Sequence, residues 1–339
     1  MNSFDYTRAT DTTTALRFAA DHPANQYVAG GTNLIDLWKY DLTHPNMLVD
    51  INGIPGLKGI HETPGGGLHL GALVSNSDTA HHPLVKARYP LLSRTILAGA
   101  TTQIRNSATN GGNLLQRTRC HYFYDAAVPC NKRVPGSGCP ARTGHNRLNA
   151  ILGHSESCIA VFPSDMCVAL AALEAVVHVT GPTGDRTIAF ADFHRLPGDR
   201  PEFDNNLRPD ELITAIELPP EGYATNHSYL KLRDRNSYAF ALVSVATGLV
   251  LEGGKIARAR IALGGVAHVP WRVPEAEALL IGRAPTSESF ALAAERILDG
   301  AVGFEHNTFK IESARRAIVR NGMMALDPSS QRPGAQPSL

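Results

Sequence analysis

The stretch QYVAGGTNLIDLWKY, residues 26–40, decides the fold of the first part of the chain. Residues 26–30 have the apolar pattern of a strand that stops at a glycine pair, and residues 33–40 have helical spacing. Because Gly30 and Gly31 carry no Cβ, their backbone can approach a phosphate closely, and Thr32 adds a donor. The pattern therefore predicts either a phosphate-binding loop or an ordinary strand-to-helix turn. The glycine spacing differs from the GxGxxG of a Rossmann unit.

Elements on both sides extend this stretch into a small α/β unit. A capped helix is expected over residues 11–20 and a buried strand over 47–51, so the first 55 residues or so form strand, helix and strand. A second α/β unit, over about 56–220, begins at GGGLHLGAL and continues through a long helix over 78–98. It then includes a helix starting near Ser164, a hairpin in VVHVTGPTGDRTIAF and a strand in ELITAIELP.

The last part of the chain has a different order of elements. After a linker, PPEGYATN, strands joined at a glycine pair come first, and two helices over 287–301 and 307–324 follow. Strands followed by helices predict a separate α+β domain over 225–326, and residues 327–339 have the composition of a tail.

Composition excludes several classes of protein. The 339 residues are 43% hydrophobic and 19% charged, which is enough for two or three packed units, and the net charge of +1 disfavours a general polyanion binder. No apolar run approaches the roughly 20 residues that a membrane span needs. The first residues lack the basic and apolar regions of a signal peptide, so we expect no export signal in this chain.

A second glycine loop lies in IRNSATNGGNLLQ, residues 104–116. Its glycine pair, Gly111 and Gly112, is flanked by hydroxyl and amide side chains, including Thr109 and Asn113. Two such loops suit one long ligand with a central pyrophosphate, and FAD is the natural candidate.

Four cysteines form the most specific pattern. The stretch over 99–157 has little periodicity. It contains Cys120, Cys130 and Cys139, and Cys158 follows it directly. Four thiolates suit a tetrahedral zinc ion or a 4Fe-4S cluster, and the absence of short CxxC pairs favours the cluster somewhat. Scattered free thiols are the alternative. Cys167 lies on an apolar helix face and is expected to be a buried structural residue.

Charge is unevenly distributed around these cysteines. Residues 101–150 hold one anion, Asp125, and seven cations, namely Arg105, Arg117, Arg119, Lys132, Arg133, Arg142 and Arg147. A pyrophosphate and a thiolate-ligated cluster would both be neutralised there. Nucleic acid is the rival ligand, supported only by the aromatic run HYFY.

Asp165 also has two interpretations. As a residue of the first helical turn it complements the helix dipole, and it would equally accept hydrogen bonds from a cofactor's ribityl hydroxyls. The chain has no HExxH or GxSxG motif, which disfavours a hydrolytic metal site and a serine hydrolase.

Several segments together resemble a known family. Six segments occur in this order: AGGTNLIDL, GALVSNSD, LAGATTQIRNSATNGGNLLQRTRC, SDMCVALAALEA, ELITAIELP and YLKLRDRNSYAFALVSVA. They resemble the FAD-binding (medium) subunits of molybdenum hydroxylases, the family of xanthine dehydrogenase and carbon monoxide dehydrogenase. The cysteine-containing run RTRCHYFYDAAVPCNKRVPGSGC resembles the FAD- and 4Fe-4S-containing subunits of bacterial periplasmic aldehyde oxidases.

The resemblance implies an α+β fold. It consists of a PCMH-type FAD-binding domain over 1–220, built from two α/β subdomains and containing a cluster loop over 117–158, followed by a C-terminal domain with a three-stranded sheet and helices. It also implies that Cys120, Cys130, Cys139 and Cys158 bind one 4Fe-4S cluster. The residues implied to bind FAD are Val28, Ala29, Gly30, Gly31, Thr32, Asn33, Leu34, Leu97, Ala98, Arg105, Thr109, Gly111, Gly112, Asn113, Leu114, Gln116, Asp165, Leu212, Ile213 and Lys231.

Roles follow from the same resemblance. The two glycine loops match the pyrophosphate loops, Asp165 matches the ribityl-binding acid, and Lys231 matches a lysine near the polar edge of the flavin. Leu97, together with Leu212 or Ile213, falls where the family places apolar side chains against the two faces of the isoalloxazine ring.

The implied function is electron transfer within a molybdenum-containing aldehyde oxidoreductase. The expected partners are a large subunit with the molybdenum cofactor and a small subunit with 2Fe-2S clusters, in a heterotrimer that reduces an external acceptor. No nicotinamide fingerprint is visible, and no catalytic residue is expected on this chain. The expected location is the periplasm, if the assembled complex is exported on a partner's signal, and otherwise the cytoplasm. A free-standing flavin oxidase and a zinc-stabilised nucleic-acid or interaction module are the alternatives.

Overall fold

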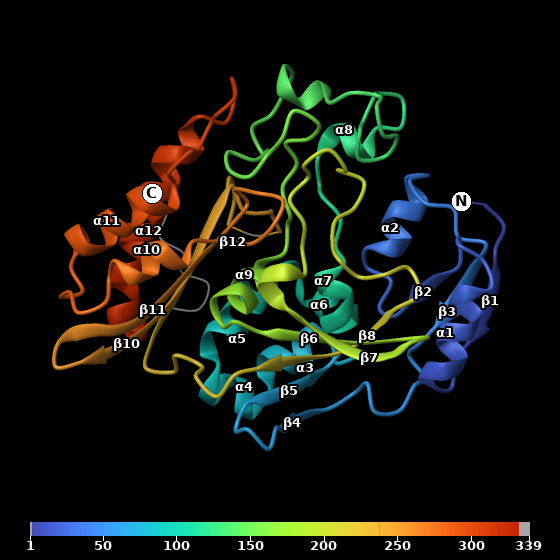
Figure 1. Ribbon diagram of the computed structural model, residues 1–339, viewed down its shortest axis with the longest axis horizontal. Helices are drawn as coiled ribbons and strands as arrows, with labels where there is room; N and C mark the ends of the chain where they lie inside the picture. The colour runs from blue at the N-terminus through green and yellow to red at the C-terminus, as the bar shows by residue number, and fades with distance from the viewer. Residues whose placement is uncertain (1, 237, 332–339) are drawn as a thin grey trace.

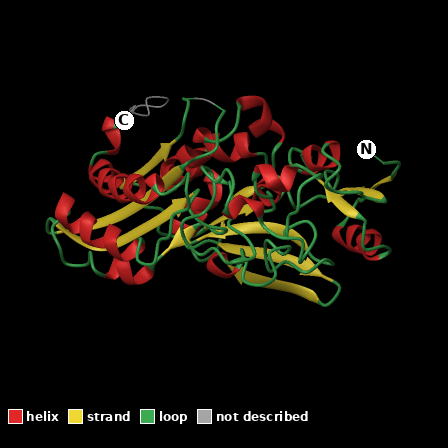
Figure 2. Cartoon of the chain, turned by 90° about the horizontal axis from the view of Figure 1, so that it is seen from above, coloured by secondary structure: helices red, strands yellow, loops and turns green. Residues whose placement is uncertain are grey.

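The computed structural model describes residues 2–236 and 238–331. Three sheets, of three, five and four strands, follow one another along the chain, and helices pack between and beside them (Figure 1). Seen from above, the N-terminal residues lie at one end of an elongated molecule and the C-terminal helices at the other (Figure 2). The expected α+β class is confirmed.

The first sheet is parallel and has the order β1-β3-β2. Its elements are β1 (Asp5–Arg8), α1 (Thr12–Ala20), β2 (Gln26–Val28), α2 (Leu34–Lys39) and β3 (Met47–Asp50). The strands predicted from the sequence correspond to β2 and β3. The pattern did not predict β1, because the residues DYTR are mostly polar and three of the four are exposed at the sheet edge.

The second sheet is antiparallel throughout, in the order β4-β5-β8-β6-β7. Its strands are β4 (Ile60–Glu62), β5 (Leu68–Gly71), β6 (Val176–Gly181), β7 (Gly184–Ala189) and β8 (Leu212–Leu218). The hairpin β6-β7 is the one predicted from its central glycine turn. A 3-10 turn, η2 (Phe190–Asp192), follows β7 directly.

Short helices connect β5 to the later strands. They are α3 (Asn76–His81), α4 (Pro83–Arg88), α5 (Pro90–Ala98), α6 (Thr102–Ser107) and α7 (Asn110–Leu114). One continuous helix over 78–98 was expected, and this prediction is wrong. Two prolines each start a new helix, because proline offers no N–H to the preceding turn and restricts the residue before it.

Helix α9 (Asp165–Ala172) joins the second and third parts of the molecule. All eight of its residues are buried, and it contacts α5 as well as strands of the C-terminal sheet. Ser164 begins the helix, since its Oγ accepts a hydrogen bond from the Cys167 N–H at 3.1 Å. The prediction that Cys167 is a buried structural cysteine is confirmed.

The chain between α7 and α9 contains little regular structure. Within this described stretch only α8 (His121–Tyr124) and the 3-10 turn η1 (Pro140–Arg142) are helical. The stretch forms the upper part of the molecule in Figure 1, between the N-terminal unit and the C-terminal domain.

The C-terminal sheet is antiparallel and has the order β12-β11-β10-β9. Its strands are β9 (Asn226–Leu232), β10 (Val243–Glu252), β11 (Lys255–Gly264) and β12 (Trp271–Arg272), and its helices are α10 (Pro274–Ala278), α11 (Ser287–Ile297) and α12 (Phe309–Leu326). The sheet thus has four strands and not the expected three, because the two-residue β12 pairs with β11. The boundary predicted near residue 220 lies between β8 and β9.

Part of the segment predicted to be a tail packs against the domain. Residues 328–330 form a 3-10 turn, η3 (Pro328–Ser330), and the Gln331 side chain donates to the Met324 carbonyl at 2.7 Å. The rest of that prediction, residues 332–339, lies outside the described residues. Among the helices that the structure describes, none combines the length and the apolar character needed to cross a membrane.

Candidate cofactor site

The two predicted glycine loops meet in space. The turn between β2 and α2 lies against the end of α6, where the Ser107 Oγ donates to the Gly30 carbonyl at 2.9 Å. A Cβ on Gly30 would come within 1.9 Å of the Ser107 carbonyl oxygen, so only glycine fits this approach. Gly31 has a φ of +68°, a second requirement for glycine.

The second glycine pair faces a neighbouring strand on one side and open space on the other. A Cβ on Gly111 would lie 3.1 Å from Ala72, whereas a Cβ on Gly112 would meet only the Thr109 Oγ1, at 3.0 Å. Thr109 begins α7 by accepting a hydrogen bond from the Gly112 N–H at 3.2 Å. Gly112 therefore presents bare backbone to the cavity beside it.

Two cavities, of about 330 and 520 Å³, adjoin at these loops. Both are lined by Thr32, Asn33 and Gly112. The smaller one, the apolar cavity, is also lined by Val28, Ala29, Leu34, Leu212 and Ile213, among others. The larger one, which we call the polar cavity after its charged and amide side chains, is also lined by Asn76, Arg105, Asn113, Gln116, Ser164, Asp165 and Lys231, among others. The two cavities therefore meet at residues of both glycine loops.

Asp165 and Lys231 form a buried ion pair in the polar cavity. The Asp165 Oδ2 lies 2.8 Å from the Lys231 Nζ, and the two side chains are only 8% and 1% exposed. Lys231 also donates to the Ala98 carbonyl at 3.1 Å, and the Tyr229 hydroxyl donates to the Asp165 Oδ1. Burial, followed by the charge of Asp165, raises the pKa of Tyr229 well above its ordinary value. The pair thus offers a negative and a positive group to the same ligand.

Sequence reasoning did not identify Tyr229 or Asn76. Tyr229 lies two residues before Lys231 in β9, so the alternation of side chains along a strand places both on one face. Asn76 is connected through Asn113, whose Nδ2 donates to the Asn76 Oδ1 at 2.7 Å and whose Oδ1 accepts from Gln116 at 2.8 Å. Asn76 falls within the segment GALVSNSD that carried part of the resemblance.

Two of the expected flavin contacts are placed differently. Leu97 is 37% exposed and is not among the residues that line either cavity, while Leu212 and Ile213 line the apolar cavity. The contacts of Leu97 and of the Leu212–Ile213 pair with the two faces of the flavin ring stay a prediction. Leu114 is fully buried, and its carbonyl accepts a hydrogen bond from the His194 Nε2 at 3.0 Å.

All four predicted cysteine ligands line one small cavity of about 10 Å³. Cys130 and Cys158 are buried, and Cys120 and Cys139 are partly buried. The Cys158 thiol donates to Cys139, which lowers the pKa of Cys139 to about 6 and raises that of Cys158, and burial raises the pKa of Cys120. Among the described residues, no group of three or more His, Cys, Asp or Glu side chains is arranged to hold a single metal ion.

Cys167 stands apart from this group, on α9. Burial raises the pKa of its thiol to about 12, so it remains protonated at neutral pH.

The excess of positive charge in residues 101–150 is largely neutralised by acidic residues outside that range. Asp204 accepts from Arg117 at 2.7 Å and from the buried Lys132 at 2.6 Å. Further ion pairs join Arg119 to Asp36, Arg142 to Glu156 and Arg147 to Asp234. The local count of cations by itself therefore does not require a bound polyanion.

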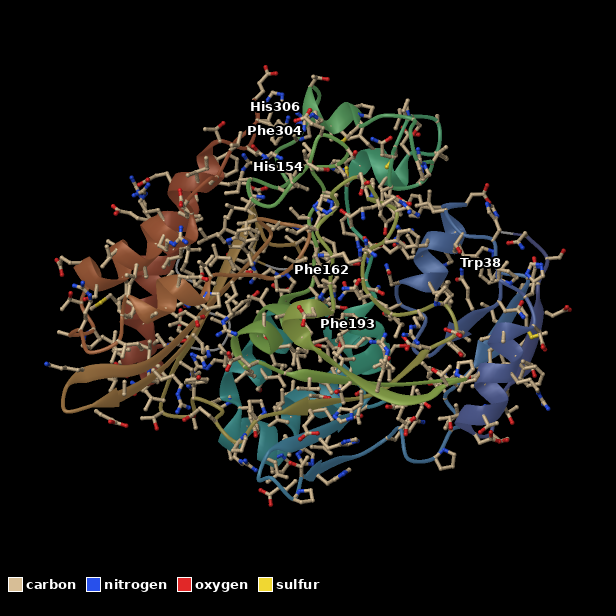
Figure 3. The ribbon with its side chains drawn as sticks, viewed as in Figure 1. Trp38, His154, Phe162, Phe193, Phe304 and His306 are labelled. Atoms are coloured by element: carbon tan, nitrogen blue, oxygen red, sulfur yellow. The ribbon has the colours of Figure 1, made fainter. Side chains whose placement is uncertain are left out.

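The cysteine cavity and the polar cavity are neighbours. A cavity of about 40 Å³ between them is lined by Cys120 and Asn149 from the first and by Ser164, Asp165 and Phe240 from the second. Beneath the loop, the ring of Phe162 packs against His194 with centroids 4.1 Å apart, and Phe162 and Phe193 lie in the centre of the molecule (Figure 3).

Comparisons with known proteins agree with this architecture. Residues 2–221 match the family described as the FAD binding domain in molybdopterin dehydrogenase, and residues 228–304 match the CO dehydrogenase flavoprotein C-terminal domain. The chain is 47% identical over 320 residues to the aldehyde oxidoreductase FAD-binding subunit of Escherichia coli, which covers 94% of this chain and 97% of that relative.

More distant relatives match the chain over nearly the same length. The carbon monoxide dehydrogenase medium chain of Afipia carboxidovorans is 28% identical over 328 residues, covering 94% of this chain and 96% of that one. The solved structure of carbon monoxide dehydrogenase from Hydrogenophaga pseudoflava superposes with a TM-score of 0.75 at 25% identity, covering 96% of this chain and 97% of that chain. The chain therefore belongs to the FAD-binding medium subunits of the molybdenum hydroxylases, a family of oxidoreductase subunits.

Proposed function

We propose that this chain is the FAD- and 4Fe-4S-binding electron-transfer subunit of a molybdenum-containing aldehyde oxidoreductase. The observation that carries the proposal is the pair of adjoining cavities at the two glycine loops, in a chain whose first 221 residues match an FAD-binding family. The aldehyde class is supported by the relative that is 47% identical.

The residues at the cavities fit FAD. Bare backbone at Gly112 leaves room for the pyrophosphate, and Thr32 and Asn33 line the same junction. Gly30 and Gly31 line the adjoining apolar cavity. Asp165, held by Lys231, is in place to accept hydrogen bonds from sugar-alcohol hydroxyls. When bound, FAD supplies the chemistry of collecting electrons from a partner's 2Fe-2S clusters and passing them to an external acceptor.

The four thiols fit a 4Fe-4S cluster by the chemistry of the donor set. Cys120, Cys130, Cys139 and Cys158 line one cavity, and four thiolates are the usual ligand set of such a cluster. Because the cavity has a volume of only about 10 Å³, we expect the sulfurs to move apart when the cluster enters. The cluster supplies one-electron transfer, and its binding contributes to the stability of the loop.

The partners that we propose are a large subunit with the molybdenum cofactor and a small subunit with 2Fe-2S clusters. Relatives along nearly the whole chain are named medium chains of multi-subunit dehydrogenases, which supports a heterotrimer. Substrate oxidation then belongs to a partner, and this chain binds, orients and insulates the cofactors through which electrons leave.

We also propose that the complex is exported after assembly, on a partner's signal. A subunit already loaded with FAD and a cluster cannot be threaded unfolded through a translocon without losing both. Deleting the partner's signal should then leave this subunit in the cytoplasmic fraction, and its continued appearance in the periplasm would contradict the idea.

Anaerobic mixing with an aldehyde tests the main proposal. In the assembled complex the flavin absorption should bleach on addition of an aldehyde, since electrons arrive from the molybdenum subunit. The isolated chain, mixed with the same aldehyde, should show no bleaching. Bleaching of the isolated chain would favour a free-standing flavin oxidase, and no bleaching in the complex would refute the electron-transfer role.

A further inference from the structure

Two side chains outside the cysteine set place a nitrogen beside a sulfur, and a thiolate there requires that nitrogen to carry the proton. The His268 Nε2 lies 3.3 Å from the Cys158 Sγ, and the Asn149 Nδ2 lies 3.6 Å from the Cys120 Sγ. His268 comes from the connection between β11 and β12 in the C-terminal domain, whereas Asn149 comes from the cysteine loop itself. Both side chains are buried, so water does not compete for these contacts.

The backbone fixes the position of His268. The Val266 carbonyl accepts from the N–H groups of Ile151 and Leu152, at 2.9 and 3.0 Å, and the Ala267 carbonyl accepts from the Phe162 N–H at 3.0 Å. The segment before His268 is thus hydrogen-bonded to the cysteine loop on both sides of Cys158. The imidazole is held against this sulfur by backbone contacts that do not depend on its own ring.

Lys310 in the first turn of α12 and Asn307 just before the helix hold both donor segments together. The Lys310 Nζ donates to the Asn149 carbonyl at 2.8 Å and to the Gly265 carbonyl at 2.5 Å, and Asn307 also donates to the Asn149 carbonyl, at 3.2 Å. Lys310 and Asn307 are fully buried. In Figure 3, His154, Phe304 and His306 gather at the same junction between the loop and the C-terminal domain, with the rings of His154 and Phe304 5.0 Å apart.

A thiolate has lone pairs and no proton, so it can only accept in these contacts. An N–H donor at a ligating sulfur stabilises negative charge on that sulfur. Adding one electron to a cluster adds one negative charge, which spreads onto its thiolates. The donor therefore stabilises the reduced cluster more than the oxidised one, and the reduction potential rises.

We propose that His268 and Asn149 are positioning residues that raise the reduction potential of the cluster through N–H···S hydrogen bonds to Cys158 and Cys120. This inference rests on the proposed 4Fe-4S cluster. It assigns the C-terminal domain a role in electron transfer, since that domain supplies one donor and locks the other in place.

The test is a redox titration of the purified full chain with dithionite, followed by the spin-resonance signal of the reduced cluster, with iron measured in each sample. His268→Leu should retain iron and show a potential more negative than that of the unsubstituted chain. His268→Gln, whose amide can still donate to the sulfur, should recover part of the shift. The matched control is His227→Leu, because His227 is a buried histidine of the same domain that does not line the cysteine cavity.

The outcomes separate this inference from the cluster assignment. An unsubstituted chain without iron would overturn the assignment and the inference together. Iron retained in His268→Leu at an unchanged potential, or an equal shift in His227→Leu, would overturn the inference alone. If His268→Leu loses its iron, the potential of Asn149→Ala is measured instead. This variant removes the N–H donor to Cys120 and keeps the backbone carbonyl that accepts from Lys310. An unchanged potential in Asn149→Ala would refute the proposal.

Discussion

Replacing Asp165 with alanine separates the cofactor role of the buried ion pair from its structural role. Asp165 accepts from Lys231 at 2.8 Å and from the Tyr229 hydroxyl, at a position where the carboxylate side chain is only 8% exposed. Breaking a buried pair from one side leaves an uncompensated charge and costs about 3–5 kcal/mol of unfolding free energy. We expect a loss of this size in the cofactor-free Asp165→Ala variant.

The effect on FAD is a separate quantity. Hydrogen bonds to charged groups contribute about 1.5–3 kcal/mol, so the loss of the carboxylate should raise the Kd for FAD by about 10- to 150-fold. The double variant Asp165→Ala/Lys231→Met removes both charges. It should recover most of the stability, because neither ion is left unpaired, and it should not recover FAD binding.

Urea denaturation of the cofactor-free protein measures the free energy of unfolding. Titration with FAD, followed by flavin fluorescence, measures the Kd for FAD. Asp165→Asn is the matched variant, because it keeps the shape of the side chain and removes its charge. An unchanged Kd for FAD in Asp165→Ala would refute the assignment of this residue. Restored FAD binding in the double variant would show that the single variant acted through stability alone.

Three further predictions concern the glycine loops, the cysteines and a buried histidine. Gly112→Val should fold with normal stability and lose FAD, because a Cβ there meets only Thr109 and otherwise enters the cavity; Gly31→Val should also lose FAD, with added backbone strain from its φ of +68°. Normal flavin content in both variants would contradict the loop assignment. Serine at any one of the four clustered cysteines should lose iron and speed proteolysis within 117–158, whereas Cys167→Ser should retain iron; full iron in two of the four variants would refute the ligand set. Burial lowers the pKa of His194 to about 4 from an ordinary 6.5, so the folded state resists its protonation. The contribution of His194 to the free energy of unfolding should therefore be nearly constant above pH 6.5 and fall by about 3 kcal/mol as the pH drops to 4. His194→Gln should remove that part of the pH dependence in denaturation curves, and an unchanged slope would refute it.

Local signals predicted most of the regular elements. Helix α1 was predicted to be capped, and the Asp11 Oδ1 does accept from the Thr14 N–H at 2.7 Å. The glycine turn at 182–184 predicted the β6-β7 hairpin. Elements whose existence depends on partners far along the chain were missed. Strand β1 is polar and is defined only by its pairing with β3, and β12 only by its pairing with β11.

At the candidate site, too, local sequence signals were predictable and contacts with distant parts of the chain were not. The glycine pairs and the four cysteines were identifiable because their residue types are unusual and their chemistry is narrow. The count of charges over 101–150 omitted Asp204 and Asp234, which pair with cations of the cysteine loop, because both lie more than 40 residues beyond the loop in sequence. The contacts of Leu97 and of Leu212–Ile213 depend on how the subdomains are arranged, and sequence spacing carries no information about that arrangement.

The central claim is that this chain holds FAD in the two adjoining cavities. The most direct measurement is the identity and amount of flavin released when the purified full chain is denatured with acid. We expect FAD, one molecule per chain in the unsubstituted protein, and none in Gly112→Val of equal stability. Release of no flavin from a correctly folded chain, or of equal amounts from both proteins, would contradict it.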